Sequence, residues 1–292
     1  MKKSPRILPY LLIAPTFLFV AVFTLYPLCT SVAGSFFKQK LQVPKYREPV
    51  WTGLGNYIRL FSDPDFRLVL LNTVIYVAVS AALIMLFSFT LALLLSGKFK
   101  GQTAFRLIVF HPAVMPMVSA ATLWLFFFTP DYGIFNQVLH FLGYRGAQNW
   151  TSNPVLALPS IILVDVWKES PFYMIFILAG LQTMDPSVLE AARLDGASGP
   201  AMLFRIIIPL IQRSLVFTSI VVFISTFQTV DHIFILTNGG PSNHSNILLY
   251  RLWQLRFEQL NIGDSQAVTV ILVAVLMIFT ITRIFTGERH EK

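Results

Sequence analysis

Charged residues are scarce in this chain, where they make up 12% of 292 residues. Soluble domains carry about 25% charged residues. Hydrophobic residues make up 55% of the chain, and they fall in long runs separated by short polar stretches, a pattern that is typical of membrane proteins. The formal net charge of +8 would point to nucleic acid in a soluble protein, but here the basic residues flank the apolar runs. We therefore attribute them to membrane topology and expect no nucleic-acid partner.

Residues that could carry catalysis or bind a metal are also sparse. The single cysteine, Cys29, excludes a disulfide within the chain, and a lone thiol cannot build a metal site. The five histidines are scattered, and the sequence contains no G-x-x-x-x-G-K-[ST] loop, no H-E-x-x-H and no G-x-S-x-G. We expect no catalytic residue, no metal site and no cofactor in this chain. An intramembrane enzyme would need a nucleophile–base pair or a metal set, and the sequence offers neither.

Six apolar runs are long enough to cross a bilayer, whose core needs about 20 helical residues. They are residues 9–32, 72–95, 107–128, 156–181, 215–236 and 267–285. Inside lipid every backbone N–H and C=O group must be paired within its own segment, so we expect each run to form a helix. The predicted fold is all-α, a polytopic membrane protein with six transmembrane helices. The first run exceeds the roughly 7–15 apolar residues of a signal peptide, and we interpret it as a retained helix.

The basic residues predict the orientation of these helices. With the N-terminus in the cytoplasm, a modest excess of Lys and Arg lies on the cytoplasmic side, as the positive-inside rule describes. Both termini are then cytoplasmic. We expect one transmembrane domain over residues 9–286, with cytoplasmic tails at residues 1–8 and 287–292. Outside the runs, Asp63 and Asp185 each precede a proline and fit the N-caps of short helices.

The fourth run contains charged residues, and a charge at the bilayer centre costs at least about 2.5–3.5 kcal/mol on insertion scales. Asp165 and Glu169 are four residues apart and share a helix face. Lys168 lies three residues after Asp165, and Tyr173 continues the face. One interpretation is an internal ion pair that neutralises itself, or a span end that lies nearer the surface. The other is a polar patch that lines a water-filled path, where Pro171 loosens the helix.

The fifth run ends in polar residues. Thr226, Gln228 and Thr229 supply hydroxyl and amide groups, and Asp231 and His232 follow, where the run reaches its outer interface. Hydroxyl groups in membrane helices often bond to their own backbone, so a purely structural role is also open. A sugar must exchange its hydration shell for new hydrogen-bond partners. Carboxylate, amide and hydroxyl groups that face one cavity are what a polyhydroxylated solute requires.

The segment between the fourth and fifth runs carries the most specific pattern. Residues 190–200 read E-A-A-R-L-D-G-A-S-G-P, and residues 206–209 read I-I-I-P. This pattern predicts a short capped helix that is stopped by Gly196, followed by a second helix that leads back into the membrane. The two small alanines would let another surface approach closely. Glu190 and Arg193 can pair within the helix or reach outward.

This segment resembles the coupling loop of ABC importer permeases, in which E-A-A is followed by three residues, a glycine, nine residues and I-x-L-P. Ile208 stands where the family usually has leucine, which is a conservative departure. Other stretches resemble the sugar-permease branch, the relatives of maltose and glycerol-3-phosphate permeases. They are residues 53–57, Asp63-Pro64 with Phe66, Asn72-Thr73, residues 133–136 and residues 237–241. The resemblance covers most of the chain from residue 53 to about residue 275.

The resemblance implies a permease subunit of a bacterial inner membrane, with a cytoplasmic coupling helix in the loop at about residues 185–209. That helix would dock on a separate ATPase subunit, which holds ATP and Mg²⁺. The implied partners are a dimer of ATP-binding subunits, a second homologous permease subunit, an extracytoplasmic solute-binding protein and membrane lipid. The implied coupling residues are Glu190, Ala191, Ala192, Asp195, Gly196 and Pro209. Mapped by offset from this loop, the substrate contacts of related permeases fall near the two polar patches. The expected substrate-path residues are Asp165, Lys168, Glu169, Tyr173, Thr226, Gln228 and Thr229.

Two other transport functions fit parts of the sequence. An ion-coupled secondary transporter could use Asp165 and Glu169 as proton or sodium sites, but it leaves the E-A-A segment unexplained. An ABC permease for amino acids or peptides would share the coupling loop and carry other extracytoplasmic motifs. The solute itself stays open among monosaccharides, oligosaccharides, polyols and glycerol phosphate. A phosphate would favour cationic groups, and Lys168 is the one clear cation in a predicted span.

Overall fold

A computed structural model describes residues 8–97 and 99–288, with side chains over residues 9–282 except residue 98. The ends of the two predicted tails, residues 1–7 and 289–292, lie outside the described residues. The same holds for Lys98 and for the basic residues at those ends, which helped to predict the orientation.

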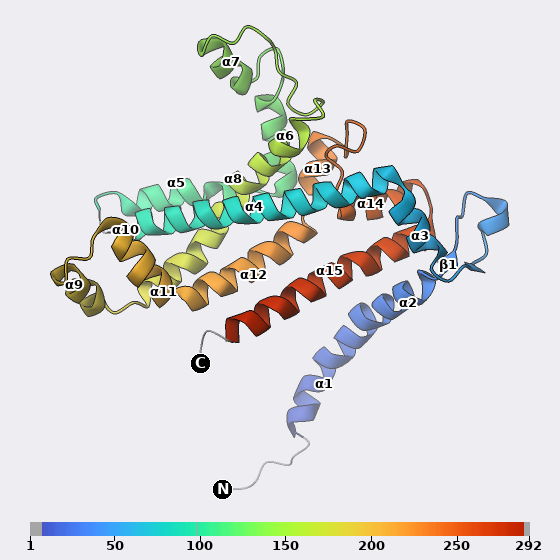
Figure 1. The fold of residues 1–292 in the computed structure, drawn as a ribbon, viewed down its shortest axis with the longest axis horizontal. Helices are drawn as coiled ribbons and strands as arrows, with labels where there is room; N and C mark the ends of the chain where they lie inside the picture. Colours follow the sequence, from blue (N-terminus) through green and yellow to red (C-terminus); the bar gives the residue numbers. More distant parts are fainter. Residues whose placement is uncertain (1–7, 98, 289–292) are drawn as a thin grey trace. The chain divides into compact units, whose positions relative to one another are not determined.

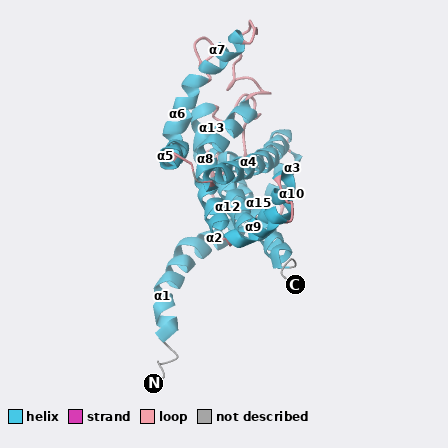
Figure 2. Cartoon of the chain, turned by 90° about the vertical axis from the view of Figure 1, so that its left-hand side faces the viewer, coloured by secondary structure: helices cyan, strands magenta, loops and turns pink. Residues whose placement is uncertain are grey.

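The described chain is mainly helical, with only two short strands (Figure 1; Figure 2). The strands β1 (Phe37–Lys38) and β2 (Val50–Trp51) form one short antiparallel ladder, in which Phe37 lies opposite Trp51. The prediction of an all-α fold is confirmed. By its internal contacts the chain divides into two compact units, one within Met1–Arg67 and Arg251–Met277, the other within Leu68–Tyr250 and Ile278–Lys292.

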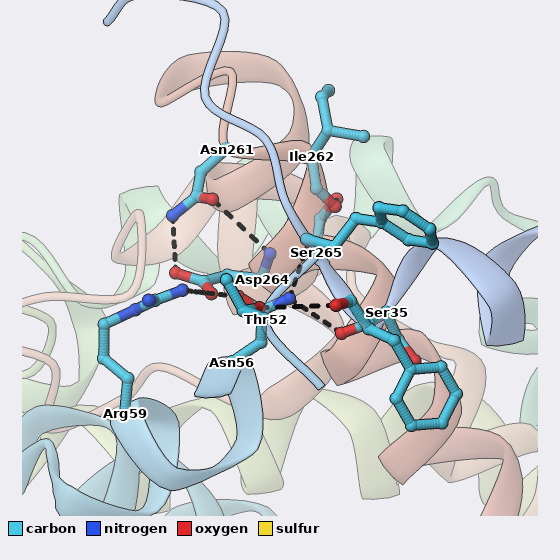
Figure 3. Close-up of polar contacts among 10 residues, drawn as sticks. Ser35, Thr52, Asn56, Arg59, Asn261, Ile262, Asp264 and Ser265 are labelled. Atoms are coloured by element: carbon cyan, nitrogen blue, oxygen red, sulfur yellow. Dashed lines mark hydrogen bonds and ion pairs between the residues drawn. The ribbon is translucent and has the colours of Figure 1, made fainter. Parts of the chain in front are cut away.

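The first unit is held together by a polar network at one end of its helices (Figure 3). Its elements are α1 (Leu8–Val20), the π-helical η1 (Ala21–Leu25), α2 (Tyr26–Gly34), the 3-10 turn η2 (Pro44–Tyr46), α3 (Gly55–Ser62), the π-helical η4 (Gln254–Glu258) and most of α15 (Ile262–Glu288). The Asn56 amide donates to the carbonyl oxygens of Ser35 at 2.7 Å and Phe37 at 2.8 Å. Arg59 donates to Asn56 Oδ1 at 2.8 Å and pairs with Asp264 of α15. The G-L-G-N-Y motif therefore supplies the asparagine that joins α2, the strands and α3.

The second unit contains the elements that were singled out as functional. Its elements are most of α4 (Pro64–Ser96), then α5 (Gln102–Val114), α6 (Met117–Phe127), α7 (Ile134–Phe141), α8 (Ala157–Gln182), α9 (Pro186–Leu194), α10 (Gly199–Met202), the π-helical η3 (Leu203–Ile207), α11 (Ile208–Leu210), α12 (Gln212–Gln228), α13 (Asp231–Leu236) and the start of α14 (Leu248–Trp253). The N-cap predicted at Asp63 is present, because its Oδ1 accepts from the Asp65 backbone N–H at 3.1 Å. The helix that it starts is α4 itself and not a separate short helix.

Four helical stretches among the described residues are long and apolar enough to cross a membrane, or five if α5 and α6 count as one bent span. The four are Pro9–Gly34, Pro64–Ser96, Gln212–Leu236 and Ile262–Thr282. The fourth predicted span is present as the 26-residue helix α8, but it carries Asp165, Lys168 and Glu169. The predicted total of six transmembrane helices stays a prediction.

The third predicted span is not the continuous helix that the sequence led us to expect. It consists of α5 and α6, which are bent by 98° at a short break. Met115 at the break has an extended backbone, with φ −71° and ψ 139°, because the ring of a following proline disfavours the helical conformation of the residue before it. Pro116 therefore breaks this run.

The fifth predicted span is broken as well. Thr229 adopts φ −86° and ψ 127° at the end of α12, and α13 begins two residues later. The Thr229 hydroxyl donates to the Ser225 carbonyl oxygen at 2.9 Å. The Thr229 hydroxyl therefore bonds to the backbone of its own helix, which was the structural alternative for the hydroxyl groups of this run.

An apolar cluster joins α4, α8 and the start of α12. It contains Ala92 and Leu95 of α4, Met174, Ile177, Leu178 and Leu181 of α8, and Ile211, all of them buried. A Cβ atom added at Gly180 would overlap the side chain of Ser214. Gly180 therefore permits the close approach of α8 and α12.

Candidate functional site

The helix α9 has a well-formed N-cap, as the sequence predicted. Asp185 Oδ1 accepts from the Ser187 backbone N–H at 2.9 Å, and Pro186 occupies the first helical turn. This hydrogen bond lowers the pKa of the Asp185 carboxyl below its usual value. The helix therefore begins at a point that its own sequence fixes.

The C-terminal end of α9 is closed by Gly196, whose φ is +83°. The Gly196 N–H donates to the Arg193 carbonyl oxygen at 3.1 Å, and the Ala197 N–H donates to the Ala192 carbonyl oxygen at 2.9 Å. This pair of bonds is a Schellman motif, which favours glycine because only glycine adopts the left-handed conformation without strain. The space around an added Cβ is open, so the requirement at Gly196 comes from backbone conformation.

The predicted coupling residues lie mostly at the surface of this capped helix. Glu190, Ala191, Asp195 and Gly196 are exposed, whereas Ala192 is buried. Pro209 is exposed on α11. In Figure 1, α9 projects from one end of the second unit, far from α7 and α13. The arrangement offers a small, charged, solvent-facing helix.

Both ends of the α9–α11 segment reach the apolar cluster of α4 and α8. Met184, just before α9, packs against this cluster, and so does Ile207 at the end of η3. Ile211, which directly follows α11, is one of its buried members. A displacement of α9 would therefore be transmitted to α8 through packed side chains.

The predicted polar patch of α8 is built differently, from residues that are far apart in the sequence. Asp165 is 1% exposed, and its Oδ2 accepts from the Tyr76 hydroxyl of α4 at 2.9 Å. The same hydroxyl lies 3.1 Å from Nε2 of His232 in α13. The network thus links α4, α8 and α13. Among the described residues, Asp165 Oδ1 and His232 Nδ1 are buried without a hydrogen-bond partner.

The ion pair that the sequence suggested in this patch is present, but it does not include Asp165. Lys168 Nζ lies 3.0 Å from Oε1 of the neighbouring Glu169. Their side chains are 11% and 18% exposed, respectively. The cation of this span is therefore neutralised by the adjacent residue, and Asp165 depends on Tyr76 instead.

The remaining predicted substrate-path residues differ in their exposure. Tyr173 is buried and lies beside Ser225 of α12. Thr226 is buried, and Gln228 is exposed. The assignment of these residues to a substrate path stays a prediction.

Tyr76 and His232 are the parts of the α8 network that the sequence did not reveal. His232 was placed at the outer interface, but it is fully buried, while its neighbour Asp231 is exposed. Tyr76 lies within an apolar run, and no local pattern marks it. The one signal that could have identified either residue is an aromatic side chain with a polar atom inside a predicted span.

The Asn72-Thr73 motif holds the loop that follows α13. The Asn72 amide donates to the Asn243 carbonyl oxygen at 2.8 Å. The Thr73 hydroxyl accepts from the Leu248 N–H at 2.8 Å. The loop that they hold contains the T-N-G-G-P motif, whose Thr237 hydroxyl accepts from Ser245 at 2.8 Å. These motifs build one ordered loop against the start of α4.

The sequence of this chain is similar to those of known transport proteins. The model of the family described as binding-protein-dependent transport system inner membrane component matches residues 84–287. The sulfoquinovosyl glycerol transport system permease protein of Agrobacterium fabrum is 34% identical over 94% of this chain and 88% of its own length. The trehalose/maltose transport system permease protein of Thermococcus litoralis is 31% identical over 99% and 96%.

A solved structure has a similar fold. It is the crystal structure of a bacterial alginate ABC transporter in complex with an alginate pentasaccharide-bound periplasmic protein. One of its chains superposes with a TM-score of 0.83 at 20% sequence identity, over 98% of this chain and 95% of that chain. This likeness shows that the helical arrangement is that of an ABC transporter chain.

Proposed function

The chain belongs to the family of binding-protein-dependent transport system inner membrane components, and on that basis we propose that it is the permease subunit of an ATP-driven importer of a sugar or related polyol. It is a transport subunit and not an enzyme. Two of its relatives are named for sulfoquinovosyl glycerol and for trehalose and maltose. These solutes share many hydroxyl groups, and the polar side chains of α8 and α12 suit such a solute because each hydroxyl needs a new hydrogen-bond partner.

The observation that carries this proposal is the construction of α9. It is an exposed helix, closed at both ends by its own caps, and the α9–α11 segment meets the cluster that holds α8 through Met184 at one end and Ile211 at the other. Such a helix suits docking on a separate cytoplasmic subunit. In the proposed assembly, Glu190 meets a basic group of an ATP-binding subunit, and ATP with Mg²⁺ stays on that subunit.

The proposed assembly contains two ATP-binding subunits, a second homologous permease and an extracytoplasmic solute-binding protein. The α9 side of the chain and both termini face the cytoplasm. When the ATP-binding subunits close, they pull α9, and Met184 and Ile211 pass the movement to α8. The solute site then changes from inward-facing to outward-facing, as a two-state equilibrium biased from the cytoplasm.

The ion pair on α8 argues against phosphate binding by Lys168. Lys168 is compensated by Glu169 at 3.0 Å, so its charge is not free to bind a phosphate. The unpartnered buried atoms of Asp165 and His232 suit a hydroxyl group that can both donate and accept.

A charge reversal tests this proposal. We expect Glu190→Lys to abolish ATP-dependent solute uptake and the copurification of an ATP-binding subunit, while the chain still inserts in the membrane. Gln182→Lys is the control, because it introduces a lysine at the exposed end of α8, outside α9, and we expect it to transport normally. Labelling of residue 190 from the extracytoplasmic side, or normal uptake by Glu190→Lys, would contradict the proposal.

A further inference from the structure

The short helix α7 has three distinct faces. It contains residues 134–141 and begins directly after Gly133. One face is buried, one is exposed and apolar, and one is exposed and polar. The boundaries between these faces run along the helix axis, because residues three or four positions apart lie on the same side of a helix.

The buried face fixes how α7 is oriented. The Asn136 amide donates to the carbonyl oxygens of Pro130 at 3.0 Å and Gln148 at 2.9 Å, and its Oδ1 accepts from the Gln148 N–H at 3.0 Å. Phe135 packs between Trp124 of α6 and Trp150, with ring centroids 5.5 Å from each. Hydrogen bonds and aromatic contacts therefore hold the helix from one side. These contacts fix the direction in which the opposite side faces.

The opposite side is apolar. Ile134, Val138, Phe141 and Leu142 are between 51% and 90% exposed, and their spacing aligns them in one stripe. A surface this apolar is unfavourable in water, at about 25 cal/mol per Å² of apolar area. Exposed apolar stripes of this kind mark contact with lipid or with another protein.

A polar face adjoins this stripe. Gln137 and His140 are exposed, and they lie on the flank of α7 between the stripe and the buried side. A helix at a membrane–water boundary has this division, with an apolar face toward the acyl chains and a polar face toward water. Val118 and Phe126 of the preceding helix α6 are also exposed and apolar, and Asn136 holds α7 to the carbonyl oxygen of Pro130, three residues beyond α6.

We propose that α7 lies in the outer membrane–water interface, with the stripe of Ile134, Val138, Phe141 and Leu142 in lipid and Gln137 in water. The partner of this surface is the acyl-chain region of the outer leaflet. This inference goes beyond the proposed transport function, because it concerns only how the chain sits in the bilayer.

The helix α3 in the first unit is built on the same plan. A glycine precedes each buried asparagine by three residues, Gly53 before Asn56 and Gly133 before Asn136. On the exposed side of α3 and its N-cap lie Leu54, Ile58 and Phe61. The chain thus uses a buried asparagine twice to turn the apolar side of a short helix outward.

Spin labels at two adjacent positions test the proposal. In the assembled transporter in liposomes, with the single Cys29 replaced by alanine, Val138→Cys and Gln137→Cys each receive a nitroxide label. The two side chains point about 100° apart around the helix axis. We expect the ratio of oxygen to nickel-chelate collision rates to be several-fold higher at residue 138 than at residue 137, because oxygen concentrates in lipid and the chelate stays in water.

Three other outcomes would overturn the proposal. Equal exposure of both labels to the nickel chelate would place α7 in water. Shielding of the residue 138 label from both reagents would mean that a protein partner covers the stripe. A lipid-like ratio at both positions would place α7 below the interface. Leu142→Cys repeats the measurement on the same stripe if the Val138 variant does not assemble.

Discussion

The helix α9 and the polar patch of α8 both carry charged residues, but they are stabilised in opposite ways. The hydrogen bonds that define α9 join residues a few positions apart, from Asp185 to Ser187 and from Ala192 to Ala197. In the network around Asp165, Tyr76 of α4 contacts Asp165 of α8 across 89 residues of sequence and His232 of α13 across 156. The helix α9 is exposed, and its caps use only neighbouring residues. The polar patch of α8 is buried, and its contacts come from other helices of the second unit.

This difference separates two kinds of mutational effect. A change in α9 should leave the membrane helices intact and remove only the connection to the partner. A change in the α8 network should weaken the folded unit itself, because a buried polar group that loses its partner costs about 1–3 kcal/mol. The following variants test whether the separation holds.

The largest effect is expected at Gly196. Gly196→Val should reduce uptake to background, because a β-branched residue resists the positive φ that closes α9. The amount of chain in the membrane should not change. Gly196→Asn is the matched control, because asparagine tolerates the left-handed conformation, and it should retain most of the uptake. If the valine variant transports normally, the shape of the α9 end is not needed for coupling.

Tyr76→Phe should lower the free energy of unfolding by about 1–3 kcal/mol, because Asp165 loses its buried donor. The midpoint of thermal unfolding of the purified transporter measures this loss. Tyr132→Phe provides the comparison, since Tyr132 is exposed, and its midpoint should not move. A normal midpoint for Tyr76→Phe together with lost uptake would mean that the network serves the solute and not the fold.

Gly180→Ala should destabilise the contact of α8 with α12, since the new methyl group overlaps Ser214. Overpacking of this kind costs about 1–3 kcal/mol. Ser214→Gly in the same chain should restore most of the stability, and a double-mutant cycle measures that coupling. Additive effects of the two substitutions would show that the helices do not approach at this point.

The smallest effect is expected at the N-cap of α9. Asp185→Ala should reduce uptake by no more than a few-fold, because the remaining turns of α9 and its C-terminal motif persist. Since the pKa of Asp185 is lowered in the folded chain, the contribution of this cap is complete above the ordinary carboxyl pKa and is lost only as the pH falls through the lowered value. Uptake in the wild type should therefore not depend on this group at neutral pH. Loss of the Asp185 contribution to uptake near pH 7 would contradict a lowered pKa for this carboxyl.

The caps of α9 could be predicted from the sequence because capping uses the residues next to the helix end. Asp185 and Gly196 are such residues, and both prove to have the predicted roles in the helix. The network around Asp165 could not be predicted, since Tyr76 and His232 come from other helices. Their proximity is a property of packing and leaves no trace in local spacing.

The two breaks in the predicted spans show a similar contrast. Pro116 marks the first break. Residues 107–128 were predicted as one continuous helix because the apolar character of a run does not show where its backbone bends. The break at Thr229 has no proline or glycine beside it. The helix after this break, α13, packs against α6 and α8, and a single sequence does not reveal such tertiary contacts.

The 98° bend between α5 and α6 sets an order for the insertion of this chain into the bilayer. The 13 residues of α5 make a helix of about 20 Å at 1.5 Å per residue, and a bilayer core is about 30 Å thick. Neither α5 nor the 11-residue α6 can therefore anchor the nascent chain alone. Their packing partners, α8 and α13, are synthesised later. We expect residues 102–127 to enter the membrane as one span already broken at Pro116, and to be held in place only after α8 and α13 have left the ribosome.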